Sequence, residues 1–139
     1  MKYKYQMHTH TAPCSKCAPM TPGELIDSLV AGGYSGCVLT NHFYDGNTGI
    51  DKSLAWDEFV VAYEKDYLEC KKIAQRYDLN VIFCIEEHLF DGLEIFCYGI
   101  TPQFLFDHPE LRGNHSIEAW SNALRDFGAL CIQAHPYRD

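Results

Sequence analysis

The sequence has no long hydrophobic run, no repeats and no low-complexity tract. No window approaches the roughly 18 apolar residues that a membrane-spanning helix needs. The first four residues, Met1-Lys2-Tyr3-Lys4, also lack the apolar core of a secretory signal peptide. We therefore expect one cytoplasmic domain spanning residues 1–139, without membrane association.

Basic residues are scarce. The chain has 11 lysines and arginines against 19 aspartates and glutamates, which gives a net charge of -8. A nucleic-acid-binding surface is normally basic, so we expect no stable binding to nucleic acid. The charge does not exclude an anionic substrate, because bound divalent metals can reverse the local field inside an acidic shell.

The seven cysteines do not form a paired pattern. Four lie in apolar runs and are expected to be buried free thiols, namely Cys37, Cys84, Cys97 and Cys131. Cys14 and Cys17 have Cys-x-x-Cys spacing, but no second pair accompanies them and prolines lie on both sides. This context argues against a closed zinc knuckle and a thioredoxin-like helix. We interpret them as two loop thiols that should react first with a thiol reagent.

Helical and strand patterns alternate along the chain. Apolar segments predict five strands, at residues 3–7, 36–40, 80–85, 93–100 and 129–133. Helical spacing and capping residues predict three helices, at residues 21–33, 53–77 and 116–128. Strands that are apolar throughout and alternate with helices are typical of a parallel sheet covered on both faces. The sequence thus predicts an α/β fold of about five parallel strands, with a tight or irregular connection between the third and fourth.

Potential metal ligands follow four of the five predicted strands. They are His8 and His10, His42, the run Glu86-Glu87-His88, and His135. In parallel α/β folds the carboxyl ends of the strands converge on one rim, so these side chains are expected to meet. Imidazoles with a bridging carboxylate suit zinc, manganese or iron.

Each of these motifs also has a simpler explanation. A lone His-x-His pair can lie on the surface, His42 can cap a loop, and His135 before a proline can be a turn residue. Coincidence at four strand ends is unexpected, however, so the joint pattern favours a metal site. We interpret the remaining histidines, which lie in loops or at a helix start, as surface residues: His88, His108 and His115.

The ordered motifs resemble the PHP (polymerase and histidinol phosphatase) family of metal-dependent phosphoesterases. "MHTHT", "GYSGCVLTNHF", "FCIEEH" and "AHPYR" occur in the family's order, and "TPGELIDSLVAGGY" fits the segment between the first two. The resemblance covers essentially the whole chain. It implies a distorted barrel of seven strands that binds up to three divalent metals at the carboxyl ends of its strands.

The resemblance also implies roles for individual residues. His8 and His10 would hold one metal, Glu86 would bridge two, His135 would hold the second, and His42 would belong to a third. The implied activity is hydrolysis of a small phosphoester with zinc, manganese or iron. Arg138 could contact the substrate phosphate bidentately, or be a surface arginine near the chain end.

The sequence departs from the family pattern at several points. Asn41 replaces the usual aspartate, Cys84 replaces a glycine, and the fourth strand lacks its usual ligand histidine, for which His115 is a candidate. The family's last two strands and closing Asp-x-His pair would lie beyond Asp139. We therefore expect the N-terminal part of a PHP domain, an incomplete barrel whose open sheet edges could support oligomerisation.

Two other functions stay open at this point. The missing ligands are compatible with a metal-binding or regulatory module that has little or no turnover, in which case metal would be present without hydrolysis. Amidohydrolases also begin with His-x-His. That family usually needs a carbamylated lysine or a glutamate at a later strand end, plus a final aspartate, and no lysine lies at a predicted strand end.

Overall fold

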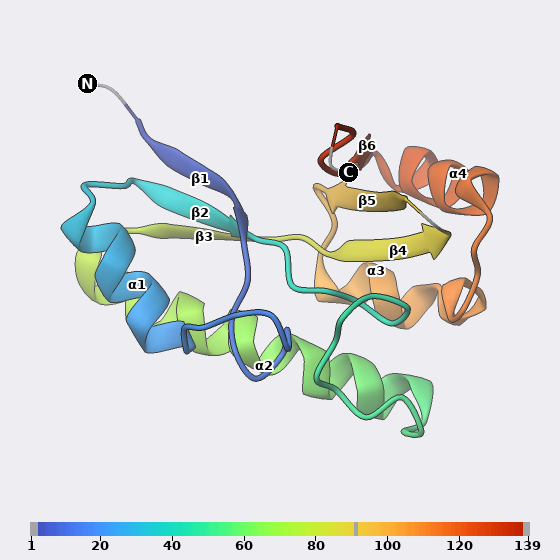
Figure 1. The fold of residues 1–139 in the computed structure, drawn as a ribbon, viewed down its shortest axis with the longest axis horizontal. Coiled ribbons are helices and arrows are strands. Elements are labelled where there is room, and N and C mark those ends of the chain that lie inside the picture. The colour runs from blue at the N-terminus through green and yellow to red at the C-terminus, as the bar shows by residue number, and fades with distance from the viewer. Residues whose placement is uncertain (1–2, 91, 138–139) are drawn as a thin grey trace.

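The computed structural model describes residues 3–90 and 92–137, and Figure 1 shows its arrangement. The strands are β1 (Tyr5–Thr9), β2 (Gly36–Leu39), β3 (Asn80–Phe83), β4 (Glu86–Phe90), β5 (Leu93–Tyr98) and β6 (Leu130–Gln133). The α-helices are α1 (Pro22–Ala31), α2 (Trp56–Ala74), α3 (Pro102–Asp107) and α4 (Ile117–Phe127). Short 3-10 helices follow α2, at Gln75–Tyr77, and α3, at Pro109–Leu111. The prediction of an α/β fold is confirmed.

The first half of the fold is a parallel sheet in the order β1-β2-β3. Helices α1 and α2 form the two crossover connections, and both lie on one face of the sheet (Figure 1). All four residues of the central strand β2 are buried, as expected for a parallel strand with neighbours on both sides. Thr21 caps α1 as predicted, and its side chain forms a reciprocal capping box with Glu24.

The second half is an antiparallel sheet in the order β4-β5-β6, so the prediction that all strands run in parallel is wrong here. Only two residues separate β4 from β5, and a connection this short can join only antiparallel strands. Gly92 in this turn has a φ of +75°, which glycine adopts readily. The described strands therefore form two three-stranded sheets, and a closed barrel is not seen among them.

A short segment between β3 and β4 joins the two sheets. Past the end of β2, the Glu86 amide donates to the Asn41 carbonyl at 3.0 Å, and the Phe43 amide donates to the Glu86 carbonyl at 2.8 Å. On its other side, Ile85 accepts a hydrogen bond from the Cys97 amide of β5 at 3.1 Å. The segment thus has backbone partners in both sheets, which fixes the start of β4.

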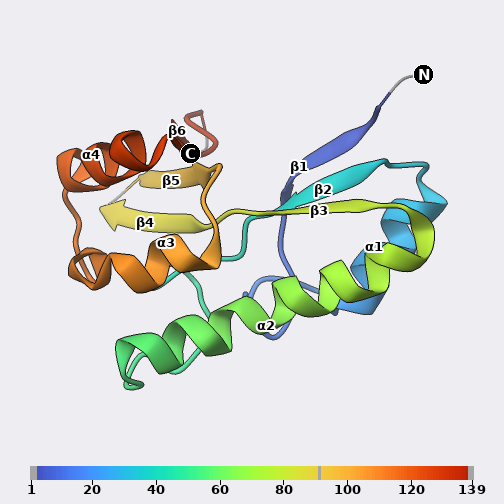
Figure 2. The ribbon, with the colours of Figure 1, turned by 180° about the vertical axis from the view of Figure 1, so that it is seen from behind.

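Helix α2 contributes to the cores under both sheets, and Figure 2 shows it running along the molecule beneath them. Its first half packs Phe59 and Tyr63 against Phe43 and Trp120. Its second half contributes Cys70 and Ala74 to the core shared with α1 and the parallel sheet. Within residues 3–90 and 92–137, no helix combines the length and apolar character that a membrane crossing requires.

All seven cysteines are free thiols, but their burial differs from the expectation at two positions, Cys14 and Cys131. Cys37, Cys84 and Cys97 are buried as predicted, and Cys131 is half-buried. Cys14 is also buried, because the loop after β1 folds back onto α2 and its amide donates to Asp66 Oδ2 at 3.2 Å. Burial, together with the negative charge of Asp66, raises the pKa of the Cys14 thiol well above its usual value.

We expect Cys17 to be modified first when the folded protein meets a thiol-alkylating reagent, followed by Cys131. Cys17 is the exposed thiol, whereas burial raises the pKa of Cys37 to about 11 and that of Cys84 to about 12, so their thiolates are rare. Time-resolved mass spectrometry of peptides would give the order of labelling. Denatured protein, in which all seven should react alike, is the control, and early labelling of Cys14 would contradict the described loop.

Candidate metal centre

Glu86 is the centre of the candidate site. It is the first residue of β4, and only 1% of its side chain is exposed. Because neighbouring side chains on a strand point to opposite faces, Glu86 and Glu87 face different surroundings. A carboxylate this deeply buried needs partners that compensate for its lost hydration.

Four histidines supply those partners. His8, His10 and His42 each place a ring nitrogen near Glu86 Oε2, at 3.3, 3.2 and 3.5 Å respectively. His135 Nε2 lies 2.9 Å from the other oxygen, Oε1. Burial by itself raises the pKa of Glu86, but the contacts with His10, His8 and His42 outweigh it and hold the pKa well below its usual range. The structure thus brings together all five of the metal ligands proposed from the sequence.

These histidines come from separate parts of the fold. His8 lies on β1 and His10 just after it, His42 follows β2, and His135 follows β6. His135 has a φ of +27°, which residues other than glycine rarely adopt. Such backbone strain is found mainly where the surrounding structure places a functional side chain. The fold therefore holds the His135 ring against Glu86 in spite of an unfavourable backbone.

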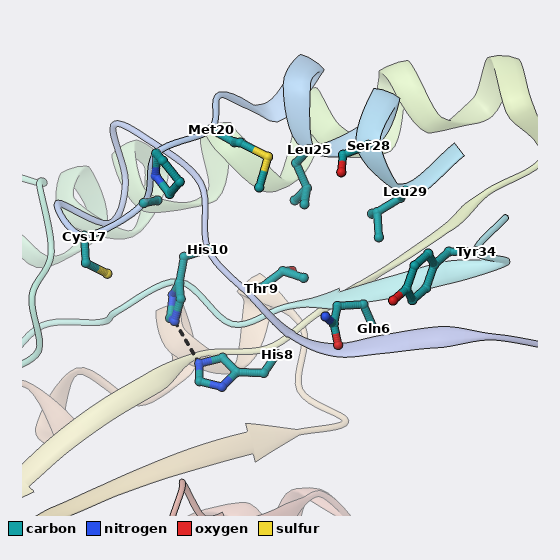
Figure 3. Close-up of a pocket in the computed structure, with 12 residues that line it drawn as sticks. Gln6, His8, Thr9, His10, Cys17, Met20, Leu25, Ser28, Leu29 and Tyr34 are labelled. Atoms are coloured by element: carbon teal, nitrogen blue, oxygen red, sulfur yellow. Dashed lines mark hydrogen bonds between the residues drawn. The ribbon is translucent and has the colours of Figure 1, made fainter. Parts of the chain in front are cut away.

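The imidazole rings are packed closely together. His8 Nε2 and His10 Nε2 are 2.8 Å apart, as the dashed line in Figure 3 marks, and the rings of His10 and His42 stack with centroids 4.6 Å apart. Several nitrogens therefore point toward one carboxylate oxygen. Imidazole nitrogen combined with carboxylate oxygen is a ligand set that suits zinc, iron and manganese, so the residues present fit a divalent metal.

Two further residues extend this ligand set, and the sequence analysis missed both roles. Glu94 Oε2 lies 3.1 Å from His135 Nε2. Donor atoms lie within 4.8 Å of one another in three overlapping groups: His8, His10 and Glu86; His42, Glu86 and Glu94; and His10, Cys17 and His42. Glu94 was missed because β5 was expected to run in parallel, with its ligand at the far end. The signal available was one acidic residue in an otherwise apolar strand.

Buried polar side chains next to the site position its histidines. Asn41 accepts hydrogen bonds from the Thr11 amide at 2.7 Å and from Ser15 Oγ at 3.0 Å. Ser15 Oγ in turn accepts from the His42 amide at 2.9 Å and lies 3.4 Å from His10 Nδ1. Such outer contacts orient metal-binding imidazoles and fix which nitrogen faces the metal. Asn41, which stands in place of an expected aspartate, therefore has a positioning role.

The other residues considered from the sequence lie elsewhere. Glu87 accepts from the amides of Asp45 and His88, both at 2.8 Å, and burial raises its pKa to about 8. His115 contacts Asp45 at 3.2 Å and belongs to none of the three donor groups. Of the other two histidines assigned to surface loops, His108 contacts Glu110 and its side chain is 28% exposed. His88 instead lies on β4 and is half-buried, so its assignment to a loop is wrong. Arg138 lies outside the described residues.

An apolar cavity of about 350 Å³ adjoins the histidines, between β1 and α1 (Figure 3). His8 and His10 form part of its wall, and Cys17 lies at the same end. The rest of the wall is largely apolar and includes Met20, Leu25, Leu29 and Tyr34. Within residues 3–90 and 92–137, no lysine or arginine lines it. The cavity is thus suited to an uncharged group close to the donor atoms.

Comparisons with known proteins give a likeness of fold. No protein-family model and no curated protein matches the chain. An amidohydrolase from Chromobacterium violaceum, solved with bound sulfate and no metal, aligns with a TM-score of 0.50 and 20% identity over 78% of this chain and 34% of its own. A putative metal-dependent phosphoesterase from Bifidobacterium adolescentis aligns with a TM-score of 0.47 and 16% identity over 81% of this chain and 35% of its own. The chain thus spans about a third of each structure.

Proposed function

We propose that this chain forms the metal-binding part of a divalent-metal-dependent hydrolase that cleaves small phosphoesters, within a PHP-type domain. The observation that carries the proposal is the convergence of four histidines, from three separate regions of the chain, on the buried carboxylate of Glu86. The sequence motifs and the fold shared with an amidohydrolase support it. In this proposal the parallel sheet is the first part of an incomplete seven-stranded barrel.

The donor groups suggest how metal ions would be held. His8, His10 and Glu86 would hold one ion, while His42, Glu86 and Glu94 would hold another. Bound divalent ions would neutralise phosphate oxygens and activate a water molecule for attack on phosphorus. Glu86 belongs to both groups, so its carboxylate would contribute to both positions. His135, between the carboxylates of Glu86 and Glu94, would complete the second position.

The proposed substrate is a small phosphoester bound through these metals. With a net charge of -8, the protein would repel a phosphate group unless cations were bound at the site. Arg138 remains a proposed phosphate contact. Stable binding to nucleic acid is not part of the proposal, since the acidic chain would repel its phosphates.

Replacing both His8 and His10 with alanine is expected to remove at least one metal ion per chain. The variant deletes two of the three donors in the group that contains Glu86, and no neighbouring donor can replace both. Elemental analysis of purified wild type and variant would measure this loss. His108→Ala, which changes a histidine paired with Glu110, is the matched control and should keep the wild-type metal content. Equal metal content in all three proteins would contradict the proposed ligands.

Hydrolysis of an aryl phosphate in the presence of manganese or zinc tests the reaction itself. Turnover that needs added metal and disappears in the His8→Ala/His10→Ala variant would support the proposal. Metal binding without turnover would instead favour the metal-binding or regulatory module. An amide substrate run in parallel examines the amidohydrolase alternative, and amide cleavage without phosphoester cleavage would overturn the proposed substrate class.

A further inference from the structure

The loop between β1 and α1 brings a thiol to the metal centre. Donor atoms of Cys17, His10 and His42 lie within 4.8 Å of one another. Cys17 is exposed, while its motif partner Cys14 is buried. Figure 3 shows the Cys17 side chain beside the His10 ring. The two cysteines of the Cys-x-x-Cys motif therefore have different surroundings, and one faces metal-binding residues.

Backbone contacts hold this loop in place. The Lys16 amide, next to Cys17, donates to the Asn47 carbonyl at 3.0 Å, and the Gly49 amide donates to the Cys14 carbonyl at 2.7 Å. Position 49 needs glycine, because a Cβ there would collide with the Pro13 carbonyl oxygen. On the other side of Cys17, the Ala18 amide donates to the Ser15 carbonyl at 3.1 Å. Cys17 is thus presented by an anchored loop.

The number of donors exceeds what one ion can coordinate. The residues in the donor groups, together with His135, are His8, His10, Cys17, His42, Glu86, Glu94 and His135. A tetrahedral zinc ion takes four ligands, and an octahedral ion takes about six. At least two metal positions are therefore needed to use the whole set. The group that contains Cys17 includes neither carboxylate, so it differs in chemistry from the other two.

We propose that Cys17 is a metal ligand and that its thiolate, with His42 and His10, forms a position selective for a thiophilic ion such as zinc or ferrous iron. The inference rests on the proposed metal centre. On binding, the Cys17 thiol gives its proton to solvent and the thiolate sulfur bonds to the ion. Sulfur ligands favour zinc and iron over manganese and magnesium, whereas the groups containing Glu86 accept either kind of ion. Because His10 and His42 each belong to a second group as well, Cys17 is the residue that distinguishes this position.

Cobalt(II) substitution tests the inference, because a cobalt–thiolate bond gives a charge-transfer band in the near ultraviolet that nitrogen and oxygen ligands do not. The wild-type chain, titrated with cobalt, should show this band. Cys17→Ser should lose the band and bind one ion fewer per chain. Cys131→Ser, which changes a half-buried thiol on β6, is the matched control and should keep both.

A second variant separates loss of a ligand from loss of the fold. Cys17→Asp replaces the thiolate with a carboxylate, so it should bind at least the wild-type number of manganese ions without showing the cobalt–thiolate band. A band that persists in Cys17→Ser would overturn the inference. Cobalt binding by wild type without any such band would overturn it but leave the proposed metal centre standing. Failure of wild type to bind cobalt at all would overturn both.

Discussion

Glu86→Gln is expected to lower metal affinity on the order of a hundredfold or more and to abolish any metal-dependent hydrolysis. The substitution keeps the size of the side chain but removes the negative charge that four histidines surround. Mutating the outer partners of metal ligands already lowers affinity roughly 10- to 100-fold, and loss of a proposed ligand itself should exceed that. Competition with a metal-sensitive dye would measure the affinity.

Glu87→Gln is the matched control for that experiment. Glu87 is the next residue on the same strand, its burial raises its pKa to about 8, and it is in none of the donor groups. At neutral pH its carboxyl is therefore mostly uncharged, and a neutral amide is a mild replacement. We expect metal affinity close to wild type. Equal losses in the Glu86→Gln and Glu87→Gln proteins would contradict the proposal that Glu86 is a metal ligand.

Phe43→Ala is expected to reduce the free energy of unfolding by about 3–5 kcal/mol, the usual loss when a buried phenylalanine is cut back to alanine. The Phe43 side chain is fully buried, and its ring contacts those of Trp56, Phe59, Tyr63 and Trp120. Domains are stable by roughly 5–15 kcal/mol, so the loss is a large share of the total. Urea unfolding followed by tryptophan fluorescence would measure it.

The effect of Phe43→Ala should also reach the metal centre. Phe43 follows the proposed ligand His42, and its amide donates to the Glu86 carbonyl. Phe127→Ala, at a position where 43% of the side chain is exposed, is the control and should change the free energy of unfolding far less. Equal losses in the free energy of unfolding from both substitutions would contradict the proposed contribution of Phe43 to the core.

Most local elements are predicted from the sequence because their signals are local, although β4 and α3 are not among the predicted elements. Thr21, Pro22 and Glu24 are close in sequence, and together they determine where α1 begins. The ligands at the ends of β1 and β2 were also accessible, since parallel strands joined by helices bring their carboxyl ends to one rim. The sequence therefore predicts that His8, His10 and His42 lie together.

The features that the sequence does not predict depend on strand direction and on loop packing, which short sequence patterns do not determine. The apolar run around Glu94 has the same pattern in a parallel and in an antiparallel strand. The sequence therefore does not show which end of β5 faces the site. The burial of Cys14 depends on Asp66, 52 residues away in sequence. The position of Cys17 beside two histidines is likewise not predicted, because those histidines lie outside the Cys-x-x-Cys motif.

The join between the two sheets has a consequence for how the protein tolerates insertions and deletions. Glu86 and Glu87 are adjacent carboxylates on opposite faces of one strand, with backbone partners on either side of the join. Deleting one residue between Phe83 and Glu86 would shift the strand by one position, turning Glu87 toward the histidines and Glu86 toward the interior. Glu87 would then take the place of Glu86 beside the histidines, while Glu86 would take the fully buried place of Ile85. A deletion here would therefore keep a carboxylate at the histidines but bury a second one in the apolar core, which is costly without partners.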